Sequence, residues 1–572
     1  PKTTDTNANA AIKPKGNGAN VAQDPDGTAT GGNARGEYAT DWQKGRSANN
    51  EVASGDYSVI GGGLNNLASG LQSTVGGGGG NTASGGRAKV GGGQNNTASN
   101  SYSTVSGGLS NTASATRATV GGGEGNTASS DRATIGGGLN NIASGDRATV
   151  SGGHTNHALS AESTVGGGLT NTASSDRATV GGGENNTASS PKSTIGGGQN
   201  NISSGEQSTV GGGLNNTASG QRSFVGGGEG NTASGTKATV SGGNNNFASN
   251  FYPTVGGGLS NTANANRATI SGGDSGTASG QFSTVGGGQR NTPSGGRATV
   301  SGGQDNTASD SFSAVSGGQD NTASGAHATV GGGQNNTASS GTHATVSGGL
   351  NNTASNNRAT VSGGEANTAG FQYSTISGGR SNAASNSYST VGGGINNNAS
   401  GQYGAVSGGQ SNTASDVYAT VGGGFTNTAS NTYATVGGGR NHTASGQFST
   451  VGGGTRNTAS GYGSTVSGGN RAVALRYGQF AHASGIFVSN GDAQYCRYIV
   501  RTATTDATAN VELFLDGTGG INTITIPEGR AYQFHIYITS IQQTGNNAKS
   551  SEITGLIRRE SGQNATIVGQ HT

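Results

Sequence analysis

The residues best suited to chemistry recur at one position of a 15-residue repeat. Twelve residues after a Val or Ile anchor, earlier copies favour cations, namely Arg87, Arg117, Arg132, Arg147, Arg177, Lys192, Arg222 and Lys237. Six consecutive later copies carry aromatic rings, namely Tyr373, Tyr388, Tyr403, Tyr418, Tyr433 and Phe448. Stacked rings of this kind would offer sugar rings a platform. The plainer interpretation is a stabilising ladder or a contact between chains.

A second regular position, six residues after the anchor, is Asn in 25 of 28 copies. Members of this set are Asn96, Asn171, Asn216, Asn306 and Asn412, and the exceptions are Gly276, His442 and Ala472. An inward Asn would lie about 4.8 Å from the Asn of the next coil, so its amide could bond along the stack and to turn backbone. We expect a structural Asn ladder rather than a ligand site.

Nothing in the sequence predicts catalysis, a cofactor or a metal. The eight His are scattered, and those at 154, 157, 327 and 343 lack acidic partners at ligand spacing. The Gly-rich segments are not followed by Gly-Lys-Ser/Thr, so they are not phosphate loops. We therefore expect a non-enzymatic protein.

Composition excludes further classes. A net charge of +2 with 10% charged residues gives no basic footprint for nucleic acid. No apolar run approaches the roughly 18 residues of a membrane span, so no membrane insertion is expected. The single cysteine, Cys496, is either a partly buried small hydrophobe or a bridge between subunits.

The repeat itself determines the elements that position these side chains. Anchors run from Ile60 to Val466 in 28 copies, with one 16-residue interval between Val330 and Val346. Gly always stands two and three residues after the anchor, which indicates positive φ or a close backbone approach. The period predicts an all-β β-solenoid of 28 coils over residues 60–485, about 130 Å long at ~4.8 Å per step.

Each coil buries little, roughly one Val, one Ala, one Ser or Ala and part of an Asn. So thin a filling hardly offsets the ordering of 15 residues, and we expect several chains to share a core. A trimer is the simplest closed fibre, although the sequence alone does not fix the number.

The two ends differ from the repeat. Residues 1–36 read as a flexible attachment tail, and residues 37–59 as an entry segment in which Trp42 either caps the first coil or anchors the attachment site. Residues 486–572 alternate as strands, with turns at Asp516, Glu528 and Gly545, and predict a small antiparallel β-sandwich. Tyr532, Phe534, Ile536 and Ile538 are expected to share one strand face, and His535, Tyr537 and Thr539 the other.

The recurring Thr-Val-Gly-Gly-Gly and Asn-Thr-Ala-Ser-Gly segments resemble the repeats of trimeric YadA-like adhesin heads. The likeness covers residues 60–485 and implies a left-handed β-roll, a trimer and surface attachment. The flanks, with Ala39-Thr40-Asp41-Trp42-Gln43 before the repeats and Gly478-Gln479-Phe480-Ala481 after them, resemble tail-fibre-like phage proteins. That resemblance implies a virion surface appendage, bound to a virion protein at its N-terminal end and to a host glycan or protein at its distal end.

Two other functions stay open. A bacterial-type cell-surface adhesin or an extracellular structural filament would use the same coils. Thr also precedes the anchor in 23 of 28 copies, and flat Thr arrays can order water, which makes an ice-binding rod the remaining hypothesis.

Overall fold

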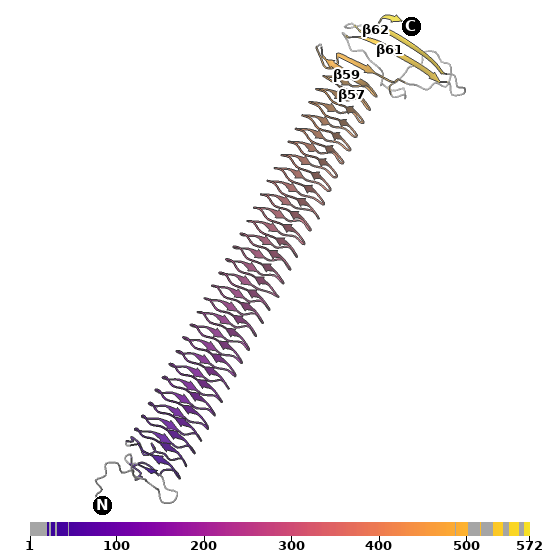
Figure 1. The fold of residues 1–572 in the computed structure, drawn as a ribbon. Helices are drawn as coiled ribbons and strands as arrows, with labels where there is room; N and C mark the ends of the chain where they lie inside the picture. Colours follow the sequence, from indigo (N-terminus) through magenta and orange to yellow (C-terminus); the bar gives the residue numbers. More distant parts are fainter. Residues whose placement is uncertain are drawn as a thin grey trace, which may run out of the picture. The chain divides into compact units, whose positions relative to one another are not determined.

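The structure, a computed structural model, describes residues 20–21, 25–28, 31–43, 45–486, 488–500, 515, 530–541, 548–559 and 566–571. Within these residues every regular element is a β-strand, and the chain forms a β-solenoid of about 30 turns with parallel sheets (Figure 1). The predicted all-β class and the solenoid architecture are therefore confirmed. The chain divides into two compact units, residues 1–351 and 352–572.

The coil that starts at Val210 shows how one repeat folds. Its anchor ends strand β23 (Thr209–Val210), and strand β24 (Thr217–Ala218) follows after a turn. β23 pairs in parallel with β25 (Phe224–Val225), so that Val210 lies beside Val225 of the next coil. A third, isolated bridge joins Leu214 to Glu229. Three parallel ladders therefore hold this coil to the next, and the third is not evident from the sequence pattern.

Gly213, third after the anchor, shows why this position is always Gly. Its φ is +92°, and an added Cβ would overlap the Gly228 carbonyl oxygen and lie 2.6 Å from Asn216 Nδ2. Both the left-handed backbone and the lack of space exclude a side chain. The neighbouring Gly212 has room, because an added Cβ there would meet nothing nearer than 3.9 Å.

Three inward columns of small side chains fill the coils. In the coil at Val210 they are represented by Ser208, Val210 and Ala218, which have no exposed surface. Each coil presents the same small groups in register to the next, so the columns pack continuously along the stack. A single chain already buries these residues completely. Any contact between chains therefore uses the outer columns rather than a shared interior.

In residues 1–351, one strand series runs from β3 (Val59–Ile60) to β41 (Thr345–Val346) and the other from β4 (Leu67–Ala68) to β40 (Thr337–Ala338). Members of the first series cover an anchor and the residue before it, and members of the second cover positions seven and eight. The second ladder divides between β32 (Thr277–Ala278) and β34 (Thr292–Pro293), because Pro293 has no N–H to donate.

The register survives the one irregular interval, and it also extends beyond the periodic sequence. Val330 pairs with Val346, so a turn absorbs the extra residue. Before the first anchor, β1 (Asn20–Val21) pairs with β2 (Thr40–Asp41), and β2 pairs with β3. Parallel pairing thus begins earlier than residue 60.

In residues 352–572, the same two series run from β43 (Thr360–Val361) to β57 (Thr465–Gly469) and from β42 (Thr353–Ala354) to β58 (Val473–Ala474). β57 pairs in parallel with β59 (Phe480–Gly485). β59 then pairs with β60 (Ala493–Arg497) in the antiparallel sense. This reversal ends the coil series.

The C-terminal strands form one antiparallel layer in the order β61 (Arg530–Ile541), β62 (Ala548–Arg559) and β63 (Thr566–His571). Along β61, Phe534 is half-buried, whereas Ile536 and Ile538 are 43% and 41% exposed. The turns expected at Asp516, Glu528 and Gly545 lie outside the described residues, as do the Tyr532 side chain and most of the expected tail 1–36.

Candidate functional surface

The Asn residues at position six form a buried column inside the coils. Asn216 Nδ2 donates to two turn carbonyls, Gly212 O at 2.9 Å and Gly228 O at 2.8 Å. Its Oδ1 accepts the backbone N–H of Asn231 at 3.0 Å. The same bonds recur at Asn96, Asn171, Asn306 and Asn412. These amides are all engaged and buried, so they hold the turns and do not face a ligand.

Position twelve lies on a strained stretch of backbone that directs its side chain outward. In 26 of 28 copies a residue other than Gly occurs there, with φ between +53° and +64°, His343 taking this place in the copy that has 16 residues. Left-handed geometry costs such residues roughly 1–2 kcal/mol each. The turn is fixed by a bond to the preceding coil, as where Arg222 N donates to Glu206 O at 2.8 Å. Successive side chains therefore stand one above another at the coil spacing.

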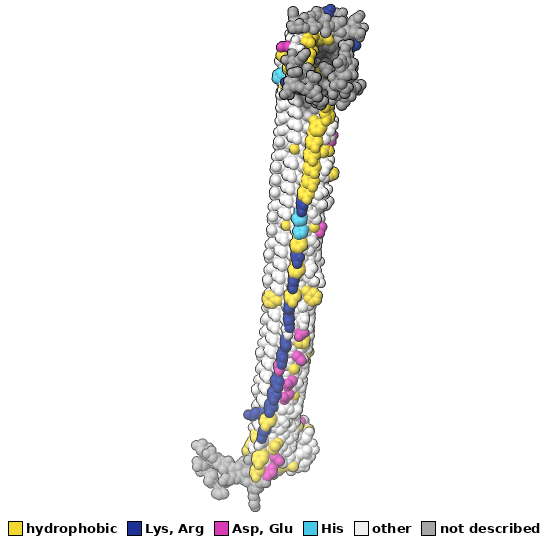
Figure 2. Space-filling model, turned by 90° about the vertical axis from the view of Figure 1, so that its right-hand side faces the viewer, with side chains coloured by type: hydrophobic (Ala, Val, Ile, Leu, Met, Phe, Trp, Pro, Cys, Tyr) yellow, Lys and Arg dark blue, Asp and Glu magenta, His cyan; other side chains and the backbone are white. Residues whose placement is uncertain are grey.

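In residues 352–572 this outer column is a stack of aromatic rings. From Tyr373 to Phe448, successive ring centroids lie 4.7–5.1 Å apart with planes within 14° of parallel. The guanidinium of Arg358 lies 5.3 Å from the Tyr373 centroid at one end, and Tyr462 meets Phe448 edge-on at the other. The rings appear as a continuous yellow column in Figure 2. We call Tyr373, Tyr388, Tyr403, Tyr418, Tyr433 and Phe448 the aromatic column.

The stacking of the rings determines which part of each ring in the aromatic column is exposed to solvent. Each inner ring has a neighbouring ring on both of its faces, and the rings from Tyr388 to Phe448 are 39–46% exposed. The exposed surface therefore consists mainly of ring edges and phenolic hydroxyls. Each stacked pair also stabilises the coils by about 0.5–1.5 kcal/mol, which offsets the strained backbone. The geometry is suited to a ladder and to a contact line along an extended ligand.

In residues 1–351 position twelve combines cations with aromatic rings and one carboxylate, that of Glu162 (Figure 2). Lys237, Tyr252, Arg267, Phe282, Arg297 and Phe312 alternate, with cation-to-centroid distances of 4.6–5.6 Å. Earlier, Arg177 donates to Glu162 at 2.7 Å, and this hydrogen bond lowers the pKa of that carboxyl. Several of these cations therefore contact a ring or a carboxylate of the same column.

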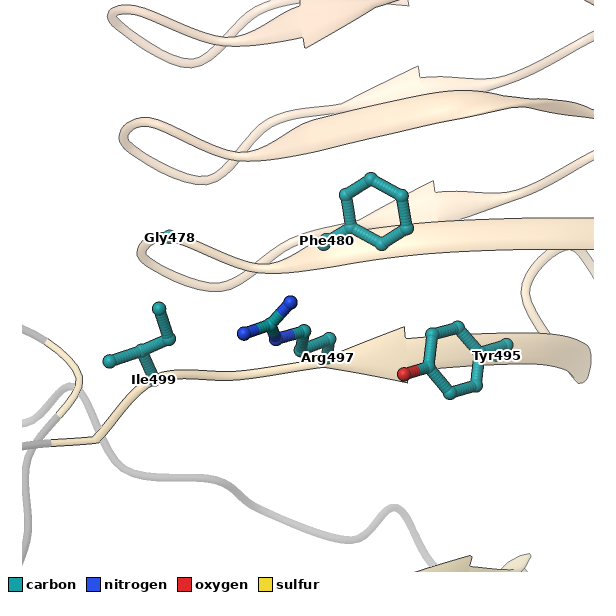
Figure 3. A pocket seen from close by; sticks show the side chains of 5 residues that line it. All are labelled: Gly478, Phe480, Tyr495, Arg497 and Ile499. Atoms are coloured by element: carbon teal, nitrogen blue, oxygen red, sulfur yellow. The ribbon is translucent and has the colours of Figure 1, made fainter. Parts of the chain in front are cut away.

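A pocket of about 260 Å³ lies beside the last strand pair of the coil series (Figure 3). Gly478, Phe480, Tyr495, Arg497 and Ile499 line it. Phe480 on β59 stands opposite Arg497 on β60. Tyr495 lies two residues before Arg497 on the same face of β60, and Ile499 follows two residues after the strand ends. The sequence does not predict this pocket, because its two sides meet only through the antiparallel return of β60.

At the N-terminal end, Gln43, which follows Trp42, caps the first coil. Gln43 is completely buried, accepts Asn66 N through Oε1 at 2.8 Å and donates to Asn66 O at 3.0 Å. It thereby takes the place of the Asn that a preceding coil would supply. The Trp42 side chain is 41% exposed, so it lies open to a contact at this end.

Other residues with possible chemistry are dispersed. Among the described residues, no group of three or more His, Cys, Asp or Glu is placed to hold a metal. Cys496 is half-buried and lies near two amide nitrogens, Gln479 Nε2 at 3.0 Å and Gln494 Nε2 at 3.1 Å. In the part of the chain that the structure covers, no helix has the length and apolar character to cross a membrane.

Comparison with models of known protein families and with curated proteins finds no match. The functional argument therefore depends on the coils, their outer columns and the pocket.

Proposed function

We propose that this chain is a non-enzymatic structural fibre of a phage-like virion, a tail or head fibre that mediates attachment to a host surface. The observation that carries the proposal is the closed interior of each coil. Within one chain the Val and Ala columns are already buried and the Asn column is already hydrogen-bonded. Each added 15-residue unit therefore lengthens the fibre without altering its neighbours. The outer columns are then free to vary along the chain, as a surface for recognition requires.

In this proposal the N-terminal region, including the exposed Trp42, binds a virion protein. The distal region binds a host glycan or protein, and three chains associate through their outer columns. We also propose that the β61–β63 layer is half of a C-terminal sandwich that closes the fibre. The resemblance of the repeats and flanks to adhesin heads and tail-fibre-like proteins supports this orientation.

Antibody labelling tests the assignment. We expect an antibody against residues 548–559 to mark the free tips of appendages in negative-stain images of intact particles, and purified chain to compete with particles for host cells. Label confined to a cell envelope, with no label on particles, would favour the alternative, a cell-surface adhesin or extracellular filament.

The aromatic column has its own test. A variant with Tyr388, Tyr403 and Tyr418 changed to Ser should lose binding on a glycan array. A control with Ile395→Ser and Phe425→Ser removes side chains that are each 40% exposed but lie outside the column, and it should bind normally. Unchanged binding by the Tyr variant would remove glycan recognition from the column.

A second candidate function follows from the Thr residues. Thr209 and Thr217 represent two half-buried columns, on the two strand series, that repeat at the coil spacing. Such regular hydroxyl arrays suit an ice-binding surface. Thermal hysteresis of the purified chain would support this candidate, and its absence would eliminate it.

A further inference from the structure

The outer column loses its side chain at two successive coils, Gly463 and Gly478. Both glycines have φ of +60°, within the range at which 26 other coils carry Arg, Tyr, Gln and other residues. The backbone conformation therefore does not require Gly here. An added Cβ would meet nothing within 4 Å at either position, so crowding does not require Gly either. What these glycines do provide is free space on the surface.

At Gly478 that free space is part of the 260 Å³ pocket. Phe480 and Tyr495 supply aromatic surface, Ile499 supplies an aliphatic side, and Arg497 supplies a positive charge. Tyr495 and Ile499 are 65% and 67% exposed, so the pocket is reached from solvent. Among the described residues, no carboxylate pairs with the Arg497 guanidinium.

These properties define a ligand class. The volume lies below the ~300–1,000 Å³ of sites for drug-sized ligands, so it suits a single ring. Aromatic faces carry negative charge density that attracts the C–H face of a sugar. A guanidinium binds a carboxylate through two parallel N–H donors. We propose that the pocket over Gly478 binds a carboxylate-bearing sugar residue. The inference rests on the proposed attachment function and gives it a specific ligand.

The test uses the full chain and two probes that differ only in the acidic group, methyl glucuronide and methyl glucoside, with binding measured by calorimetry. The wild-type chain should prefer the glucuronide about tenfold, the effect of one charge-assisted hydrogen bond. Arg497→Gln should abolish that preference. Gly478→Gln should remove binding of both sugars, because Gln fills the pocket at a position where Gln72 and Gln207 have the same backbone geometry.

Gly463→Gln is the matched control, because it makes the same change at the same φ in the same column without lining the pocket. It should bind like the wild type, and equal thermal midpoints would show that both Gln variants fold. Equal affinity for the two sugars, undiminished binding by Gly478→Gln, or no binding by the wild type would each overturn the proposal. If the chain competes for host cells without binding glucuronide, only the pocket assignment fails. If it binds glucuronide without competing, the attachment function fails instead.

Discussion

At Gly276 the buried Asn column is interrupted. Gly276 N still donates to Asn261 Oδ1 at 2.9 Å, but this coil offers no amide to the next turn or to Asn291 N. An added Cβ would lie 3.1 Å from the Asn261 amide oxygen, a tight contact, and 3.5 Å from Val285 Cγ1. The site therefore accepts the missing side chain once the Asn261 amide shifts by a few tenths of an ångström.

We predict that Gly276→Asn raises the free energy of unfolding by about 2 kcal/mol, since it supplies up to three hydrogen bonds of ~0.5–1.5 kcal/mol each. Chemical denaturation measures the change. Gly276→Ala adds only the Cβ and serves as the control. An equal gain from Ala would show that the amide contributes nothing.

His442 replaces Asn in the same column and makes it sensitive to pH. The ring is 1% exposed, its Nε2 lies 2.9 Å from Gly454 O, and its Nδ1 accepts Asn457 N at 3.1 Å. Burial lowers the pKa of His442 below its ordinary value of 6.5. The unfolded chain thus takes up a proton at a higher pH than the folded chain does.

Stability should therefore be complete above about pH 6.5 and fall as the pH drops from there towards the lowered folded pKa. Thermal midpoints between pH 7.5 and 4.5 test this. His442→Asn restores the amide of the other coils, and it should flatten the fall in that window. If His442→Asn shows the same fall as the wild type, the dependence comes from other groups.

The repeat period predicts which side chains point inward, but it does not predict the backbone conformation at every position. The inward orientation of Asn216 follows from its place two residues before the inward Ala218, and Asn216 is buried in the structure just before β24. The positive φ at Arg222 and Tyr403 does not follow, because such residues disfavour left-handed backbone. At these positions the stacking of side chains along many coils offsets the cost of the left-handed backbone. The sequence of a single repeat gives no indication of that stabilisation.

At the scale of elements, the first strands of the stack are capped by a buried cluster of charged side chains. The Asp41 carboxylate lies 2.9 Å from Arg35 Nε and 3.0 Å from Arg46 Nη2, with all three side chains 0–1% exposed. Arg35 also donates to the backbone at Gly31 O and Asn33 O. The cluster joins Arg35 and Arg46 to Asp41 of β2.

Asp41→Asn removes the charge that both guanidinium groups share and leaves them buried. We predict a loss of about 3 kcal/mol in the stability of this end, seen as faster amide exchange in β2 and β3. Asp146→Asn breaks an exposed ion pair with Arg147 and is the control, with an expected loss below about 1 kcal/mol. Equal exchange in the two variants would contradict a capping role for Asp41.

The two ends were less predictable than the coils, because their structure depends on contacts between distant residues that no repeat pattern indicates. The side-chain oxygens of Gln43 and Gln494 close the stack by accepting the backbone N–H groups of Asn66 and Val473, which are distant in sequence. In β61 the alternation predicts a strand correctly. It does not reveal what packs on either face, and the exposed Tyr537 and Ile538 lie on opposite faces of the one layer.

At the scale of the whole molecule, the closed interior of each coil means that a shared core is not the reason for chains to associate. The thin filling of each coil suggested that chains share a core, yet Val210, Ala218 and their equivalents are buried without a partner. What remains for association is the outer surface. Large apolar side chains are exposed there, in the aromatic column and at isolated positions such as Leu169 and Phe425.

We therefore predict a trimer held by outer columns, with a mass three times the 55.4 kDa of one chain in sedimentation equilibrium. The Ser variant of Tyr388, Tyr403 and Tyr418 then separates the two roles of the aromatic column. A trimer that has lost glycan binding assigns the column to recognition. A monomer assigns it to the contact between chains, because removing three exposed rings from an interface weakens its apolar centre. A wild-type mass of one chain would contradict the assembly, and the coils would then be stable on their own interior alone.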